Sequence, residues 1–168
     1  EGKKILFVPD KNLGAYIKLK TGRDIDLWEG DCCVHERFDT KTVMEMVKNY
    51  PMADILIHPE SNCSGDPAIH KLPQAYFYST SGMLSHVRNS SKNQFVIITE
   101  MEIIHQLKKE NPNREFIPAG SRALCGQMKK NTLEKVLLAL QNEAPEIRVP
   151  EELRERAWLP IKRMLEVK

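Results

Sequence analysis

Two apolar stretches decide the fold of this sequence: DILIH at residues 54–58 and QFVIIT at residues 94–99. Inside both stretches apolar and β-branched residues follow one another without polar alternation, which is typical of strands buried on both faces of a parallel sheet. Amphipathic segments with helical spacing precede and follow them. We therefore expect an α/β protein in which helices cover both faces of short parallel sheets.

The other expected elements alternate in the same way along the chain. Further strands are expected at residues 4–8, 25–28, 75–79 and 114–118, and helices at residues 40–50, 82–88, 101–110, 132–140 and 151–167. The stretch PDKNLG, residues 9–14, follows the first expected strand. A break near residue 90 divides the pattern into two similar, pseudo-symmetric α/β/α units of three layers, residues 1–90 and 91–168, and two C-terminal helices end the second unit.

The composition excludes several classes of protein. The 168 residues carry a net charge of only +2 and the basic residues are dispersed, so we expect no nucleic-acid partner. No apolar run approaches the roughly 18 residues of a membrane span, and the first residues lack the apolar stretch of a signal peptide. We therefore expect a cytoplasmic protein with no membrane partner. The four cysteines have the spacing of neither a structural zinc site nor a disulfide framework.

Reactive side chains gather at the carboxyl ends of the expected strands. In open α/β sheets ligands bind beyond these ends, so residues that follow different strands are expected to meet at one rim. The residues concerned are Cys32, Cys33 and His35 after the second strand, His58 and Glu60 after the third, Ser79 and Thr80 after the fourth, Glu100 after the fifth, and Cys125 after the sixth. This grouping indicates a site.

Each of these residues also has a structural interpretation. We interpret Cys33 and Cys63 as small core residues, whereas for Cys32 and Cys125, on rim loops, a ligand role and a packing role both stay open. The sequence His58-Pro59-Glu60 places an imidazole and a carboxylate on a stiff loop, although a structural His–Glu pair is a common outcome.

The stretch STSG at residues 79–82 is typical of a helix N-cap, and the same geometry also binds anions. A cysteine-nucleophile enzyme that uses Cys32 or Cys33 with His35 and Glu60 is a further alternative, but no oxyanion hole is evident in the sequence.

Seven motifs, in order along the whole chain, carry a resemblance to a known family. They are FVPDKNLGAYI (7–17), LWEGDCCVH (27–35), ILIHPES (55–61), YSTSGM (78–83), VIITEMEIIHQLKKENPNREFIPA (96–119), the C-x-x-M stretch that continues to 140, and RVPEELRERAWLPIKRML (148–165). Together they are far more specific than any one motif. The chain resembles the C-terminal two of the three domains of the quinolinate synthase family.

The resemblance implies a fold and an activity. In that family three similar α/β domains meet around a central pocket, and each contributes one cysteine to a [4Fe-4S] cluster. The enzyme condenses iminoaspartate with dihydroxyacetone phosphate to quinolinate in de novo NAD biosynthesis. Residues 1–90 would then be the second domain and residues 91–168 the third. The N-terminal domain, with the third cysteine ligand, is expected to be absent, so we expect this chain alone to be inactive.

The resemblance also implies a role for each rim residue. Cys32 and Cys125 match the cluster ligands, and His35, His58 and Glu60 match catalytic positions. Ser79 and Thr80 match the hydroxyls that hold the anionic groups of the substrate. The aspartate-oxidising enzyme that supplies iminoaspartate is an expected partner. A non-catalytic, anion-binding α/β module without a cluster is the alternative function.

Overall fold

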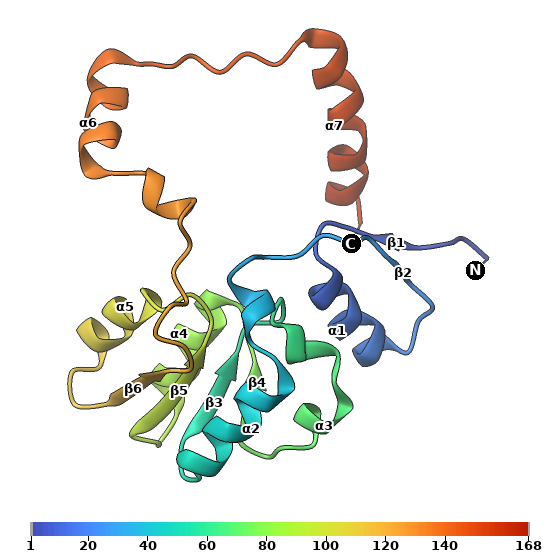
Figure 1. Cartoon of the computed structure of the whole chain (residues 1–168). Coiled ribbons are helices and arrows are strands. Elements are labelled where there is room, and N and C mark those ends of the chain that lie inside the picture. Colours follow the sequence, from blue (N-terminus) through green and yellow to red (C-terminus); the bar gives the residue numbers. More distant parts are fainter. Residues whose placement is uncertain (1, 168) are drawn as a thin grey trace. The chain divides into compact units, whose positions relative to one another are not determined.

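The computed structural model describes residues 2–167 and confirms an α/β protein with short parallel sheets (Figure 1). All six expected strands form: β1 (Leu6–Phe7), β2 (Asp26–Leu27), β3 (Asp54–Ile57), β4 (Ala75–Phe77), β5 (Gln94–Ile98) and β6 (Glu115–Pro118). The helices are α1 (Lys11–Thr21), α2 (Thr40–Asn49), α3 (Pro67–His70), α4 (Thr80–Asn89), α5 (Ile103–Glu110), α6 (Leu133–Asn142) and α7 (Glu151–Leu165).

The main sheet is parallel and has the strand order β4-β3-β5-β6. Its side chains alternate between two buried clusters. Ile55 and Ile57 of β3 lie in one cluster with Val43 of α2 and Ile69 of α3, whereas Leu56 lies in the other with residues of α4 and α5. Helices therefore cover both faces, and this explains why β3 and β5 are apolar without alternation.

The strands stay parallel, but the order in which successive strands are added to the sheet reverses between β3 and β5. From β3 it moves outward to the edge strand β4, and then it returns to pair β5 with the other side of β3. The residues that follow these two central strands lie side by side, because the His58 N–H donates to the Ile98 carbonyl at 3.0 Å. Such a reversal opens a crevice at the carboxyl ends of the strands, where ligands bind in folds of this kind.

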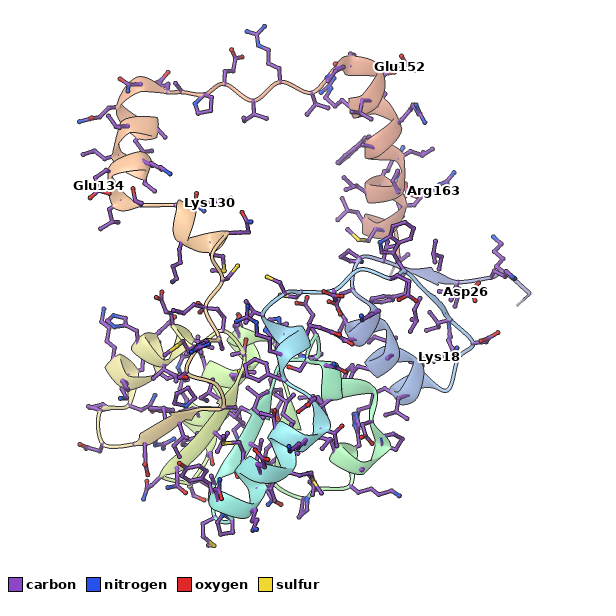
Figure 2. The ribbon with its side chains drawn as sticks, viewed as in Figure 1. Lys18, Asp26, Lys130, Glu134, Glu152 and Arg163 are labelled. Carbon is purple, nitrogen blue, oxygen red and sulfur yellow. The ribbon has the colours of Figure 1, made fainter. Side chains whose placement is uncertain are left out.

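Helix α1 was not among the expected helices, and it begins within the stretch that follows β1. Asp10 caps the helix by accepting a hydrogen bond from the Leu13 N–H at 2.7 Å, and Lys18, labelled in Figure 2, donates to the Ile25 carbonyl at 3.1 Å. The buried positions of the helix are Asn12 and Gly14. A helix whose buried face is polar or small has no apolar periodicity, so the pattern did not reveal it.

The described chain divides into two compact units, Glu1–Cys125 and Gly126–Lys168. The boundary expected near residue 90 lies within the first unit, where β3 and β5 pair across it. The assignment of residues 1–90 and 91–168 to separate family domains stays a prediction. In the second unit α6 and α7 are confirmed as helices, and both present large apolar side chains to solvent. No helix within the described range is long and apolar enough to cross a membrane.

Candidate active site

Two histidines from different parts of the chain stack beside the carboxyl ends of β3 and β5. His35 begins a short 3-10 turn after β2, and His58 directly follows β3. Their ring centroids lie 4.3 Å apart and the ring planes differ by only 12°. The adjacent Val34 is buried in the core and fixes the turn that carries His35. The structure thus brings together two residues that the sequence predicted for one site.

Glu60 places a carboxylate beside both imidazoles. Its Oε2 lies 3.2 Å from Nδ1 of His35 and 3.9 Å from Nδ1 of His58. The Glu60 N–H donates to His58 Nδ1 at 3.4 Å, so the proton of a neutral His58 lies on Nε2. The three predicted catalytic residues therefore form one cluster, which we call the His–Glu cluster.

The two nitrogens of His35 have different surroundings. Nε2 lies 2.8 Å from Oγ1 of Thr99, the residue that follows β5. Nδ1 is buried and has no hydrogen-bond partner among the described residues. Its distance to Glu60 is that of an ion pair, but the contact lacks hydrogen-bond geometry, so we treat Nδ1 as unpaired. A buried nitrogen without a partner is uncommon, and such atoms often mark a functional site.

Burial sets the charge of both imidazoles. It lowers the pKa of His35 below the ordinary value of 6.5, against the opposing influence of Asp10 and Glu100. It also lowers the pKa of His58, and the neighbouring His35 lowers it further, whereas Glu60 and Asp10 raise it. Both rings are therefore neutral at pH 7. A neutral imidazole is able to accept a proton, which suits a general base.

The two predicted ligand cysteines are held by carboxylates that act on the same histidine. The Cys32 N–H donates to Asp10 at 3.1 Å, and the Cys125 N–H donates to Glu100 at 3.4 Å. Both carboxylates influence the pKa of His35. Cys32 and Cys125 are half-buried, and both pack against the same buried cluster. The loops that carry the two thiols therefore pack against one buried cluster, and the Cys32 sulfur lies within 4.8 Å of a ring nitrogen of His35 and a carboxylate oxygen of Glu60.

The other two cysteines lie in contrasting surroundings. Cys63 is buried, as expected for a core residue, and this burial raises the pKa of its thiol to about 12. The interpretation of Cys33 as a core residue was wrong, because its side chain is exposed. The buried side chain at this point of the chain is that of the next residue, Val34. Adjacent side chains point to opposite sides here, so the Cys33 side chain faces solvent.

Ser79 and Thr80 lie at the start of α4. The Oγ of Ser79 accepts a hydrogen bond from the Gly82 N–H at 3.3 Å, so the expected N-cap is confirmed. Both residues are exposed. They follow β4, whose end pairs with the end of β3 through the Tyr78 N–H and the Ile57 carbonyl at 3.0 Å. Their role in holding a ligand stays a prediction.

Sequence reasoning did not assign a role to Asp10 or Thr99, although a signal for each was present. Asp10 is the first acidic residue after β1, and Thr99 is the first polar residue after the apolar run of β5. Polar residues at these positions belong to the rim by the same rule that selected His58. Both are buried and contact the site.

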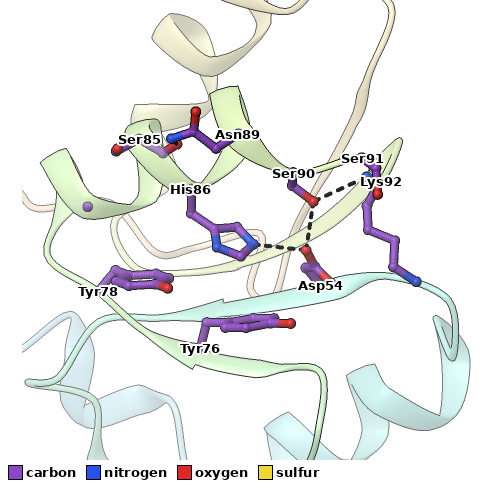
Figure 3. Close-up of a pocket in the computed structure, with 10 residues that line it drawn as sticks. Asp54, Tyr76, Tyr78, Ser85, His86, Asn89, Ser90, Ser91 and Lys92 are labelled. Carbon is purple, nitrogen blue, oxygen red and sulfur yellow. Dashed lines mark hydrogen bonds and ion pairs between the residues drawn. The ribbon is translucent and has the colours of Figure 1, made fainter.

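A second polar cluster lies at the opposite, amino-terminal end of β3 (Figure 3). The buried carboxylate of Asp54 accepts hydrogen bonds from His86 at 2.8 Å and Ser90 at 3.1 Å. It lines a cavity of about 580 Å³ together with Tyr76 and Tyr78. Both partners contact the same Asp54 oxygen, so they tie α4 to the sheet. This is the geometry of a structural ion pair.

Comparison with known proteins identifies the family. Residues 1–166 match the family model described as quinolinate synthetase A protein. Proteins named quinolinate synthase are similar to this chain at 44% identity in Gloeothece citriformis, 43% in Pyrobaculum aerophilum and 45% in Cyanophora paradoxa, over 99%, 96% and 97% of the chain. The chain spans about half the length of these relatives, at 52%, 54% and 50%. The chain therefore belongs to the quinolinate synthetase A family.

Proposed function

We propose that the protein of which this chain forms a part is a quinolinate synthase, which condenses iminoaspartate with dihydroxyacetone phosphate to quinolinate in NAD biosynthesis. The observation that carries this proposal is the His–Glu cluster beside Cys32, next to the carboxyl end of β3, in a chain of this family. The proposal concerns the complete protein, because the chain covers only about half of its relatives.

A [4Fe-4S] cluster would be held by Cys32 and Cys125, with a third thiolate from the part of the relatives' length that this chain does not cover. The residues present fit such a group. Both thiols are half-buried on rim loops, and a ring nitrogen of His35 lies within 4.8 Å of the Cys32 sulfur. Cys63 is unsuitable, because its buried thiol resists the deprotonation that ligation requires. When bound, the cluster supplies an iron that acts as a Lewis acid.

The His–Glu cluster would move the protons of the reaction. Enolisation, imine formation and dehydration each transfer a proton to or from the substrate, and groups that titrate near neutrality are suited to this. The neutral His58 is able to accept a proton. The Glu60 carboxylate, whose Oε2 lies 3.9 Å from His58 Nδ1, stabilises the imidazolium that results. Thr99 fixes the orientation of His35 through the Nε2 contact. His58 and Thr99 directly follow the buried strands β3 and β5, which hold them in place.

The substrates are anions, and the start of α4 would bind one of their charged groups. Ser79 and Thr80 offer hydroxyls there, next to the free N–H groups of the first helical turn.

We also assign residues 1–90 and 91–168 to the second and third domains of the family. The protein would act in the cytoplasm, where the aspartate-oxidising enzyme supplies iminoaspartate.

The decisive test uses the complete protein, reconstituted anaerobically with iron and sulfide. We expect about four iron atoms per protein, the number in the [4Fe-4S] cluster we propose, and formation of quinolinate from the two substrates. Cys32→Ser and Cys125→Ser should each lose the cluster, whereas the matched controls Cys33→Ser and Cys63→Ser should retain it. Full iron content in Cys125→Ser protein would contradict the ligand assignment. Absence of iron and activity from the unaltered protein would instead support the anion-binding module.

A further inference from the structure

Three potential metal ligands of different chemistry converge in the His–Glu cluster. The Sγ of Cys32, a ring nitrogen of His35 and a carboxylate oxygen of Glu60 all lie within 4.8 Å of one another. Cys32 and His35 come from one loop with two residues between them, and Glu60 comes from the loop after β3. One ion is able to contact all three atoms after small side-chain movements.

The ligand nitrogen is already oriented. His35 is 8% exposed, and its Nε2 is held by Thr99. The remaining nitrogen, Nδ1, is buried without a hydrogen-bond partner among the described residues and faces Glu60 at 3.2 Å. In metal sites the ligating histidine usually uses one nitrogen for the metal and the other for a hydrogen bond that fixes the ring. His35 has this division of roles.

We propose that Cys32, His35 and Glu60 form a site for a single borderline divalent cation, such as Zn²⁺ or Fe²⁺, distinct from the iron–sulfur cluster. One thiolate, one imidazole and one carboxylate are the ligands that these ions accept, whereas Mg²⁺ and Ca²⁺ prefer oxygen alone. Three protein ligands leave a fourth position of the tetrahedron for water. The Cys32 thiol loses its proton when the ion binds.

Single-ion binding and cluster binding would exclude each other, because both use Cys32. This consequence rests on the proposed function, whereas the single-ion site itself does not. A protein loaded with Zn²⁺ should therefore take up iron and sulfide much more slowly than metal-free protein. The cation would act as an inhibitor of cluster assembly.

Co²⁺ is the probe for the test, because its spectrum reports sulfur ligation and coordination number. Metal-free, reduced, complete protein is titrated anaerobically with Co²⁺, and Zn²⁺ is then added to displace it. We expect one Co²⁺ per protein, a sulfur-to-cobalt charge-transfer band and the intense visible bands of four-coordinate cobalt. Cys32→Ser should remove the charge-transfer band. Glu60→Gln and His35→Gln should each weaken binding at least tenfold, and Thr99→Val should weaken it by roughly 10–100-fold.

Cys125→Ser and Cys33→Ser are the matched controls, and both should bind Co²⁺ like the unaltered protein. The single-ion site is refuted if Co²⁺ binding needs Cys125 but survives loss of the His35 imidazole or of the Glu60 charge. That outcome would leave the proposed synthase intact, since the cluster assignment depends on Cys125. Circular dichroism of each variant verifies that lost Co²⁺ binding does not reflect unfolding. If His35→Gln does not fold, Co²⁺ binding by Glu60→Gln, which preserves side-chain size, tests the single-ion site instead.

Discussion

Replacing Glu60 by glutamine separates the chemical role of the His–Glu cluster from its packing. The substitution preserves side-chain size and removes the negative charge that lies 3.2 Å from His35 and 3.9 Å from His58. An acid–base group typically contributes 10²–10⁴ to the rate, which corresponds to about 3–5 kcal/mol of transition-state stabilisation. We expect kcat of the complete, cluster-loaded protein to fall by roughly this factor, with iron content unchanged.

The pH profile gives this prediction a direction. Glu60 raises the pKa of His58, against the stronger lowering by burial and by His35. Without the carboxylate the pKa of His58 falls further. A base with a lower pKa stays unprotonated in more acidic solution, so the acidic limb of kcat/KM should move to lower pH in Glu60→Gln protein.

The assay measures quinolinate formation between about pH 5 and 9, a range that brackets the ordinary histidine pKa. Glu110→Gln is the control, because Glu110 pairs with Arg88 on the surface, away from the rim, and should leave the rate unchanged. A normal kcat in Glu60→Gln protein would remove Glu60 from the mechanism. A slow enzyme whose acidic limb moves to higher pH would contradict the electrostatic reasoning.

Three further predictions concern stability and reactivity. Asp54→Asn should lower the free energy of unfolding by about 2–4 kcal/mol, because it removes the buried charge that His86 and Ser90 contact. Urea denaturation measures this loss. A loss below about 1 kcal/mol, the level of an exposed ion pair, would show that the pair is not structural. In native, metal-free protein iodoacetamide should modify the exposed Cys33 at once and Cys63 only after unfolding, because burial raises the pKa of the Cys63 thiol to about 12. Mass spectrometry of peptides from the treated protein measures this, and early modification of Cys63 in native protein would refute the prediction. Because the pKa of His58 is lowered in the folded protein, the unfolded chain protonates this histidine first as the pH falls below the ordinary 6.5. The free energy of unfolding of metal-free protein should therefore fall below this pH, and denaturation curves of His58→Gln should show a smaller fall. Equal falls in the two proteins would contradict the prediction.

The fold was predictable where burial produces a continuous apolar run. The strands β3 and β5 are central and covered on both faces, so their sequences carry no polar interruption and were located to within one residue. Helix α1 was not predictable in this way. Its buried positions are Asn12 and Gly14, and a Cβ at Gly14 would lie 2.6 Å from Leu27 Cδ2, so close packing against β2 replaces an apolar stripe.

The membership of the candidate site was predictable in part. The rule that residues after parallel strands meet at one edge placed His35, His58 and Glu60 together. It could not predict the ring stacking, nor the contact between His35 and Thr99, which lie 64 residues apart in sequence. Contacts of this kind depend on how the turn after β2 packs on the main sheet, and no local pattern in the sequence encodes that packing.

The edge position of β4 has a practical consequence. The turn that leads into this strand, around Lys71 and Pro73, is exposed and lies at the amino-terminal end of the sheet, away from the residues that follow the carboxyl ends of the strands. Extra residues at this turn would extend into solvent without displacing His58 or Glu60. A fluorescent reporter or an affinity tag inserted there should therefore leave proton transfer undisturbed.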